Sequence, residues 1–129
     1  MLCGGTMNEI LFRGKTPDGE WKKGLVVGAI KGKPNFLREF GKDGFGYFDW
    51  YIISDTVGQD TGYSDKNSKK LFEDDIFVGL LGYRYVVSYY PEHAAFMARC
   101  IETNRVDYLS AFKQSNITVI GNIHDNPLI

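Results

Sequence analysis

The sequence predicts a mostly β, single-domain fold with little helix. The first indication is a series of short segments rich in aromatic and β-branched residues, which favour strands. Clusters of glycine, proline, asparagine and aspartate separate these segments and are typical of turns. A chain of 129 residues, of which 43% are hydrophobic, also lies in the range where one domain buries enough apolar surface to fold unaided.

The stretch NEILFRGKTPDGEW predicts a β-hairpin. Ile10 and Phe12 share one face of an extended segment, because side chains alternate between the two faces of a strand. Pro17-Asp18-Gly19 is a turn signal ahead of Trp21, where the chain returns.

We expect the returning strand over residues 21–30, with Gly24 and Gly28 as weak points or bulges. Residues 31–35 contain glycine and proline and are expected to end that strand. Residues 34–46 then predict a short helical turn, with its proline near the start.

Further segments with aromatic and β-branched residues predict strands over 47–57, 75–78, 83–90 and 117–123. The segment 91–105 is ambiguous. Pro91 and Glu92 could open a helix, and the alanines and methionine that follow favour one. An extended conformation fits the same residues, and periodicity does not decide between the two for so short a run.

Charge and hydropathy limit the function classes. The 15 basic and 16 acidic residues give a net charge of −1, so the chain lacks the overall positive charge that attracts phosphate backbones. No apolar run approaches the roughly 18–20 residues that span a bilayer, and the first residues lack the features of a signal peptide. We therefore expect a soluble, intracellular protein with no membrane partner, in which Cys3 and Cys100 are reduced thiols.

The polar stretch VGQDTGYSDKNSKKLFEDD, residues 57–75, raises the possibility of a cation loop. Asp65 and Asn67 match the first two ligands of a calcium loop, but Lys69 stands at the third and Lys70 where the glycine is needed. The turn interpretation is better, because aspartate and asparagine side chains bond their own backbone. We expect no metal and no cofactor.

Acid–base chemistry is the remaining catalytic hypothesis. Glu73, Asp74 and Asp75 are adjacent carboxylates, and a small hydrolase could use Glu73 or Asp75 with one of the two histidines, His93 and His124. Neither histidine has a partner at metal-ligand spacing. A nucleophilic pair of Cys100 with a histidine is a further hypothesis, which no local motif supports.

Three blocks occur in order along the chain: NEILFRGKTPDGEW, TVGQDTGYSDKNSKKLFEDDIF and VIGNIHDNPLI. Together they resemble the YopX family of small proteins from bacterial phages and prophages. The resemblance implies a domain over residues 7–129 that starts at Met7, preceded by a flexible extension over residues 1–6. The chain departs from the family pattern at Tyr63, which replaces a leucine, and at Ser68 and Asp74, which replace glycines that are free to adopt positive φ.

The resemblance also implies a strongly curved sheet or a partly open small β-barrel, with residues 94–101 extended. It makes the central block a tight turn that feeds a strand beginning at Asp75, with Gln59, Thr61 and Asp65 holding the turn by hydrogen bonds. The residues of this candidate turn motif are Gln59, Thr61, Gly62, Asp65, Asn67 and Asp75. The resemblance supplies no catalytic residue.

Neutral charge, abundant aromatic residues and the family resemblance favour a noncatalytic binding or scaffold module. We expect it to be a homo-oligomer in the bacterial cytoplasm that contacts a host or phage protein. The alternative is a nucleic-acid-associated accessory protein, because small barrels hold single strands on faces with aromatic and basic residues. Its candidate binding residues are Trp21, Lys22, Lys23 and Arg84.

Overall fold

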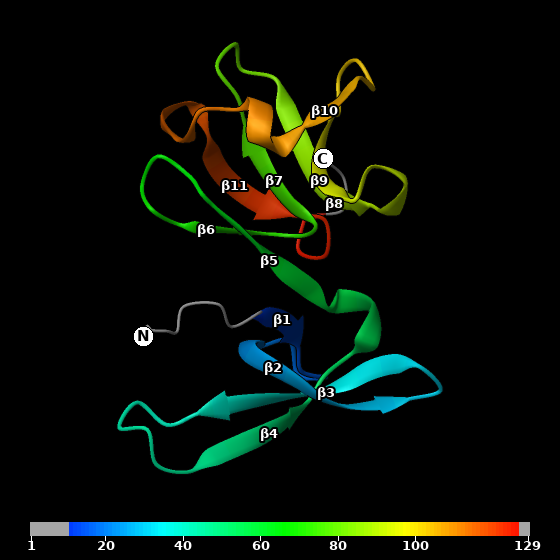
Figure 1. Cartoon of the computed structure of the whole chain (residues 1–129), viewed down its shortest axis with the longest axis vertical. Coiled ribbons are helices and arrows are strands. Elements are labelled where there is room, and N and C mark those ends of the chain that lie inside the picture. Colours follow the sequence, from blue (N-terminus) through cyan, green and yellow to red (C-terminus); the bar gives the residue numbers. More distant parts are fainter. Residues whose placement is uncertain (1–10, 127–129) are drawn as a thin grey trace. The chain divides into compact units, whose positions relative to one another are not determined.

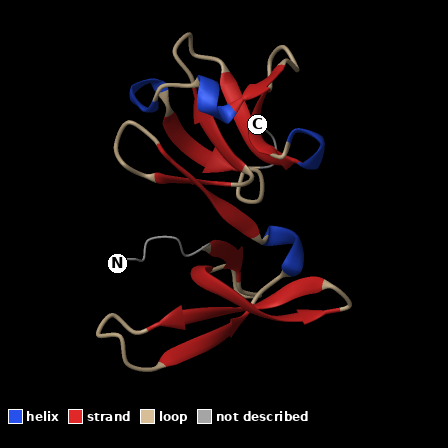
Figure 2. Cartoon of the chain, viewed as in Figure 1, coloured by secondary structure: helices blue, strands red, loops and turns tan. Residues whose placement is uncertain are grey.

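A computed structural model describes residues 11–126 of the chain. These residues form eleven β-strands and four short 3-10 helices, with no α-helix among them (Figures 1 and 2). The prediction of a mostly β protein is confirmed. The strands form two antiparallel sheets, and no closed barrel occurs in the described part. The predictions for residues 1–7 and for Ile10 lie outside the described residues.

The chain divides into two compact units, residues 1–59 and residues 60–129. In the first unit, successive strands pair antiparallel in the order β4-β3-β2-β1, and the start of β5 lies next to β1. The predicted hairpin is confirmed, with its turn closed by a hydrogen bond from the Gly19 N–H to the Thr16 carbonyl. The strands are β1 (Phe12–Lys15), β2 (Trp21–Ile30), β3 (Lys33–Phe40), β4 (Tyr47–Tyr51) and β5 (Gly58–Ser64).

The helical turn predicted for residues 34–46 is wrong, because this segment begins with strand β3. Asn35 and Leu37 are buried while the residues between and beside them are more exposed, which is the two-residue period of a strand. β3 pairs with β2 on one side and β4 on the other. Hydrogen bonding to two neighbours outweighs the local signals of proline and glycine. The connection between β2 and β3 is therefore only Lys31-Gly32, both with positive φ.

The strand predicted over residues 47–57 is shorter than expected. β4 ends at Tyr51, and Ser54–Thr56 form a 3-10 turn (η1). The Thr56 hydroxyl donates to the Ile53 carbonyl at 2.6 Å and accepts the Lys15 N–H at 2.8 Å. Polar side chains that bond nearby backbone compete with strand pairing, and here they end it.

The sheet of the first unit is strongly curved. The register between β2 and β3 shifts on both sides of Gly28, so the bulge expected at this glycine is present. The curvature brings Ile53, which follows β4, to the far end of the sheet, where its N–H donates to the Lys15 carbonyl of β1 at 2.8 Å. Leu37 and Ile52 are fully buried inside the curve.

The second unit contains the sheet β10-β9-β8-β7-β11 and a short hairpin in which β5, beyond Asp60, pairs with β6. Its strands are β6 (Lys70–Phe72), β7 (Asp75–Val78), β8 (Arg84–Tyr90), β9 (Ala95–Cys100), β10 (Val106–Tyr108) and β11 (Thr118–Asn122). The strands predicted over 75–78, 83–90 and 117–123 are confirmed within a residue at each end. The core of this unit consists of Leu71, Phe77, Val87, Ala98, Leu109 and Ile117.

The ambiguous segment 91–105 divides between the two alternatives. Pro91–His93 form one 3-10 turn (η2), which ends at Ala94 in the left-handed conformation with φ 49°. Ala95–Cys100 then form β9, which pairs with β8 and β10. The extended conformation implied by the family resemblance is therefore confirmed for β9. Short 3-10 helices Leu109–Ala111 (η3) and Gln114–Asn116 (η4) connect β10 to β11.

Close backbone packing at Gly24 generates a prediction. A Cβ atom at this position would overlap the backbone carbonyl group of Arg38, which has no freedom to move aside as a side chain would. We expect Gly24→Ala to lower the free energy of unfolding by about 1–3 kcal/mol, the usual range for overpacking. Urea denaturation followed by tryptophan fluorescence measures the change. Lys23→Ala, at the exposed neighbouring position, is the control, and an equal effect of both substitutions would contradict the packing argument.

Candidate functional site

Asp65 is the centre of the turn between β5 and β6. Its Oδ1 accepts the backbone N–H groups of Asn67 and Lys69, each at 2.9 Å, and its Oδ2 accepts the N–H of Val119 on β11 at 3.1 Å. The Asp65 carbonyl also accepts the side-chain amide of Gln114 at 2.9 Å. One buried residue therefore holds the turn in shape and joins it to a strand more than fifty residues further along the chain.

The charge on Asp65 is stabilised by these contacts. Burial by itself raises the pKa of a carboxyl group, but the hydrogen bonds from Val119, Lys69 and Asn67 favour the charged form more strongly. The pKa of Asp65 is therefore below its ordinary value. Both carboxylate oxygens already accept backbone donors, so the arrangement serves structure rather than acid–base chemistry.

Three other residues of the predicted turn motif lie on β5, which leads into the turn. Thr61 is buried, and its hydroxyl donates to the Leu71 carbonyl at 2.8 Å and accepts the Tyr63 N–H at 3.1 Å. Gly62 has φ 84°, a conformation that favours glycine. Gln59 lies further back, opposite Phe12 in the pairing of β5 with β1.

Asp75 is at the start of β7, but it does not follow the turn directly. The chain first forms β6 and then turns again through Glu73 and Asp74. Asp75 is 2% exposed, and its Oδ2 accepts the Phe72 N–H at 2.8 Å across this second turn. The carboxylate that the hydrolase hypothesis required is therefore engaged with the backbone.

The two residues that replace family glycines both have positive φ. Ser68 has φ 65° and Asp74 has φ 71°, so each side chain occupies the left-handed region that glycine enters at least cost. The turns keep the geometry that glycine favours, although neither residue is a glycine.

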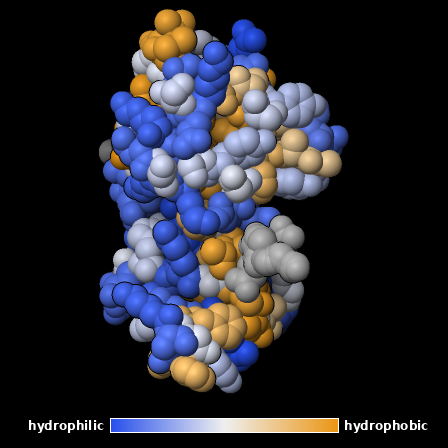
Figure 3. Space-filling view, turned by 60° about the vertical axis from the view of Figure 1, so that its left-hand side comes forward, coloured by the Kyte–Doolittle hydropathy of each residue, from blue (hydrophilic) through white to orange (hydrophobic). Residues whose placement is uncertain are grey.

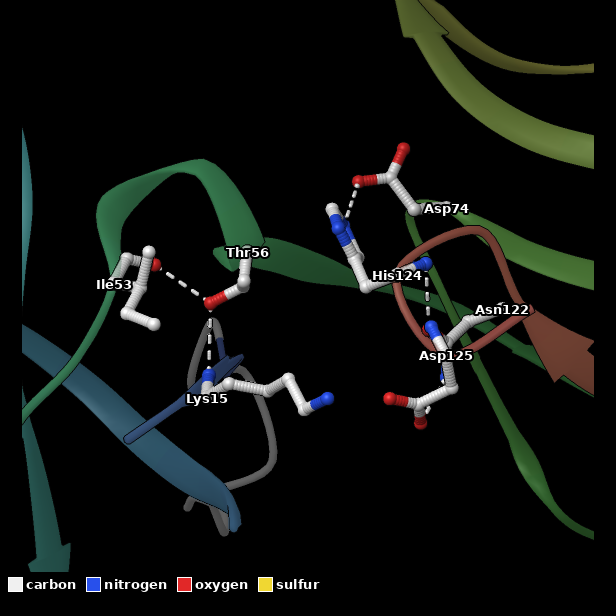
Figure 4. Close-up of polar contacts among 7 residues, drawn as sticks. All are labelled: Lys15, Ile53, Thr56, Asp74, Asn122, His124 and Asp125. Atoms are coloured by element: carbon white, nitrogen blue, oxygen red, sulfur yellow. Dashed lines mark hydrogen bonds and ion pairs between the residues drawn. The ribbon is translucent and has the colours of Figure 1, made fainter. Parts of the chain in front are cut away.

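A histidine–aspartate pair joins the closing block of the sequence to the turn before β7. His124 Nε2 lies 2.9 Å from Asp74 Oδ2 (Figure 4). The Ile123 N–H donates to the Asp74 carbonyl at 3.0 Å. The histidine is thus bonded to Asp74, which lies between the two acids that the hydrolase hypothesis named. Sequence reasoning missed this pair, because the two residues are fifty positions apart and no local pattern links them.

Asn122 organises the loop that carries this histidine. Its Oδ1 accepts the N–H groups of His124 and Asp125 at 3.0 and 2.9 Å, and its Nδ2 donates to Asp125 Oδ2 at 3.1 Å. Asn122 is also buried, so these bonds satisfy a polar side chain that burial would otherwise destabilise. The closing block is therefore a loop shaped by its own side chains.

The remaining candidates for nucleophilic chemistry lie apart from this pair. His93 packs between two tyrosine rings, with centroid distances of 6.3 Å to Tyr90 and 5.7 Å to Tyr108. Cys100 is a free thiol that is only 2% exposed. Across residues 11–126, no three His, Cys, Asp or Glu residues are grouped so that they could hold a metal ion. The described residues also include no helix long and apolar enough to cross a membrane.

Five exposed aromatic residues lie on the β3–β4 hairpin of the first unit, with Tyr47 and Tyr51 on one face of β4 and Phe48 on the other. Hydrophobic residues appear at the surface of this unit in the lower half of Figure 3. We call this surface the aromatic hairpin; its exposed members are Phe40 (53%), Phe45 (80%), Tyr47 (58%), Phe48 (58%) and Tyr51 (49%). Sequence reasoning missed this surface, because it divided the segment between a helical turn and a strand.

Two cations, one from β2 and one from β3, lie over rings of this hairpin. Arg38 lies over the ring of Tyr47 at 3.8 Å, and Lys22 lies over the ring of Trp50 at 3.9 Å. Arg38 also donates from Nε and Nη2 to the two carboxylate oxygens of Asp49, at 2.8 and 3.0 Å. The hydrogen bonds from Arg38 hold the pKa of Asp49 below its usual value.

The residues predicted for nucleic-acid binding do not belong to one element. Trp21, Lys22 and Lys23 lie together on β2, and Arg13 lies over the ring of Trp21 at 4.7 Å. Arg84 lies on β8 in the second unit, where it makes a 2.6 Å ion pair with Glu102. The backbone N–H of Arg84 also donates to Glu102, so both partners are fixed by two contacts.

The fold and these sites define a small all-β protein whose buried carboxylates shape turns and whose aromatic side chains gather on one exposed hairpin. A comparison with protein-family models matches residues 30–129 to the YopX protein family, and the chain belongs to this family. The match covers the central and closing blocks and begins after the first one. Membership suggests a phage-type protein and does not specify an activity. A comparison with curated proteins gave no significant match.

The hydrogen bonds to Asp65 generate a prediction about pH. Asp65→Asn replaces one acceptor oxygen with a donor facing the Val119 N–H, so we expect a loss of about 1–3 kcal/mol of unfolding free energy at pH 7. Because the folded-state pKa is lowered, the charge stabilises the fold above the unfolded-state pKa of about 3.9. That contribution is lost as the pH falls through the lower folded-state pKa.

Urea denaturation from pH 7 to pH 3 tests this expectation, with the exposed Asp55→Asn as control. The difference between wild type and Asp65→Asn should shrink at the acidic end, whereas Asp55→Asn should differ little throughout. A gap of constant size across the range would show that the charge of Asp65 is not what stabilises the turn.

The positive φ of Ser68 generates a second prediction. Ser68→Gly should raise the free energy of unfolding by up to about 1 kcal/mol, because glycine avoids the steric cost of the left-handed conformation. The gain stays small, because glycine loses more chain entropy on folding than serine does. Ser68→Ala retains the Cβ atom and is the matched control. Thermal and urea unfolding measure both, and a gain of equal size for Ala would refute the conformational explanation.

Proposed function

We propose that this protein is a noncatalytic, self-associating binding or scaffold module that acts in the cytoplasm of a bacterial host through contact with a host or phage protein. The aromatic hairpin is the observation that carries the proposal. Its exposed aromatic residues support the proposal, because aromatic residues are enriched where proteins bind one another.

The state of the titratable groups supports a structural role for them. Asp65 and Asp75 are buried and accept backbone N–H groups, and the free thiol of Cys100 is buried as well. A catalytic base must reach the proton that it removes, and a nucleophile must be accessible to substrate. The two carboxylates therefore stabilise turns, and the thiol of Cys100 packs in the interior.

The nucleic-acid alternative is supported less well. Base stacking needs open aromatic faces. In the first unit, Trp50 and Tyr47 each have a cation of the protein itself over one ring face. Arg84, which the alternative also invokes, is committed to Glu102. The alternative therefore becomes one outcome of the test below.

Light scattering on the purified full chain measures the mass of the assembly, and capture of tagged protein from a bacterial host lysate, with and without nuclease, identifies what it binds. We expect a mass that is a multiple of the protomer and a protein partner that survives nuclease. The matched pair of variants is Phe45→Ser, on the aromatic hairpin, and Leu81→Ser, which is 81% exposed in the β7–β8 loop.

We expect Phe45→Ser to weaken association or capture, and Leu81→Ser to leave both unchanged. A strict monomer that captures nothing overturns the proposal. Capture that is lost on nuclease treatment replaces it with the nucleic-acid alternative.

A further inference from the structure

Strand β4 is an open edge of the sheet in the first unit. Among residues 11–126 it pairs with one strand, β3, and its register with β3 is continuous from Tyr47 to Tyr51 (Figure 1). Natural edge strands are usually protected from pairing by short length, charged side chains, proline or a bulge. β4, YFDWY, is short, but it contains no lysine or proline, its register with β3 has no bulge, and its one charge, on Asp49, is paired with Arg38.

The hydrogen-bond pattern shows which backbone groups lie on the open side. The Ile52 N–H donates to the Asn35 carbonyl, and the Gly46 carbonyl accepts from Gly41, so even-numbered residues of this segment bond to β3. Antiparallel strands alternate between hydrogen-bonded and non-bonded pairs. The N–H and C=O groups of Tyr47, Asp49 and Tyr51 therefore point away from β3.

The order of side chains along β4 is nearly symmetric about its middle residue. In YFDWY, an aromatic pair precedes Asp49 and another follows it. An antiparallel pair of two such strands, related by a two-fold axis at Asp49, places Tyr47 opposite Tyr51 of the other copy and Phe48 opposite Trp50. Aromatic residues directly opposite one another are among the stabilising cross-strand pairs. A strand that complements itself fits a second copy of the same chain.

The two aspartates that meet at this axis are already neutralised. Arg38 binds both oxygens of Asp49 on the neighbouring strand, so each copy brings a paired carboxylate to the axis rather than a bare one. Like charges directly opposite one another destabilise a strand pair. The two guanidinium groups remove that obstacle and make a neutral cluster of four groups.

We propose that β4 pairs with β4 of a second copy, antiparallel and in the register that places Asp49 opposite Asp49. The proposal rests on the self-association proposed above and identifies the surface that mediates it. Every outward backbone group of Tyr47, Asp49 and Tyr51 gains a partner in this arrangement.

Disulfide cross-linking tests the register. In a full chain carrying Cys3→Ser, in which Cys100 stays buried, Asp49→Cys should form a covalent dimer with itself, because paired Cα atoms lie about 5.5 Å apart, within the reach of a disulfide. Tyr47→Cys and Tyr51→Cys should cross-link when mixed. Neither should do so alone, because four residues of strand separate equal positions by about 13 Å.

Two substitutions test the need for the edge itself. Asp49→Pro removes an outward N–H without removing a backbone hydrogen bond to β3, although it also removes the Arg38–Asp49 pair. Tyr51→Lys adds the charge that protects natural edges and keeps the Arg38–Asp49 pair. Both should be monomers by light scattering at concentrations where wild type associates, with thermal unfolding confirming that each variant is folded. Leu81→Lys, in the second unit, is the control and should retain the wild-type mass.

The outcomes separate this proposal from the proposed function. Self-cross-linking of Tyr47→Cys to the same extent as the mixture, or a wild-type mass for folded Tyr51→Lys, overturns the β4 pairing but leaves self-association standing through another surface. A monomeric wild type overturns both.

Discussion

The buried carboxylate of Asp65 is the contact on which the architecture of the second unit depends. It accepts three backbone N–H groups, two from its own turn and one from β11. The Lys66 N–H adds a bond to the Ile117 carbonyl beside it. A turn held only by local bonds would fix its own shape, but this one also fixes the register of a distant strand. The last strand of the sheet and the first hairpin of the unit are thereby joined at one side chain.

The same device recurs at the other turns of the second unit. Asp75 accepts the Phe72 N–H, Asn122 accepts two N–H groups of its loop, and Thr61 bridges to the Leu71 carbonyl. Each of these side chains is buried, and burial strengthens a hydrogen bond while making an unsatisfied group costly. Short strands such as β6 supply few ladder bonds, so polar side chains supply the remainder. This use of acids explains why a carboxylate-rich sequence need not indicate catalysis.

The sequence predicted those elements whose signal is local. The strand at Trp21–Ile30 follows a clear turn and was placed at its observed bounds, and β7 and β8 follow from their own composition. β3 was missed because proline and glycine suggested a helical turn, whereas pairing on both sides decides the conformation. The His124–Asp74 pair was out of reach, since it depends on how the closing loop meets a turn fifty residues earlier. Local chemistry predicts turns and strands, and long-range pairing decides the rest.

The Arg38–Asp49 pair lies at the middle of the open edge strand β4 and bears on the proposed pairing of two copies. An isolated ion pair on a surface contributes little to stability, because water screens the charges and ordering two side chains costs entropy. A bidentate Arg–carboxylate pair is the exception that can contribute, and Arg38 and Asp49 lie directly opposite each other in the β3–β4 pairing, so the pair stabilises the hairpin of one copy. In the proposed β4–β4 pairing it would have a second effect, because Arg38 would prevent repulsion between the two aspartates. In the second unit, acids turned inward stabilise the turns, whereas in the first unit the acid at the open edge stays at the surface and is paired with an arginine.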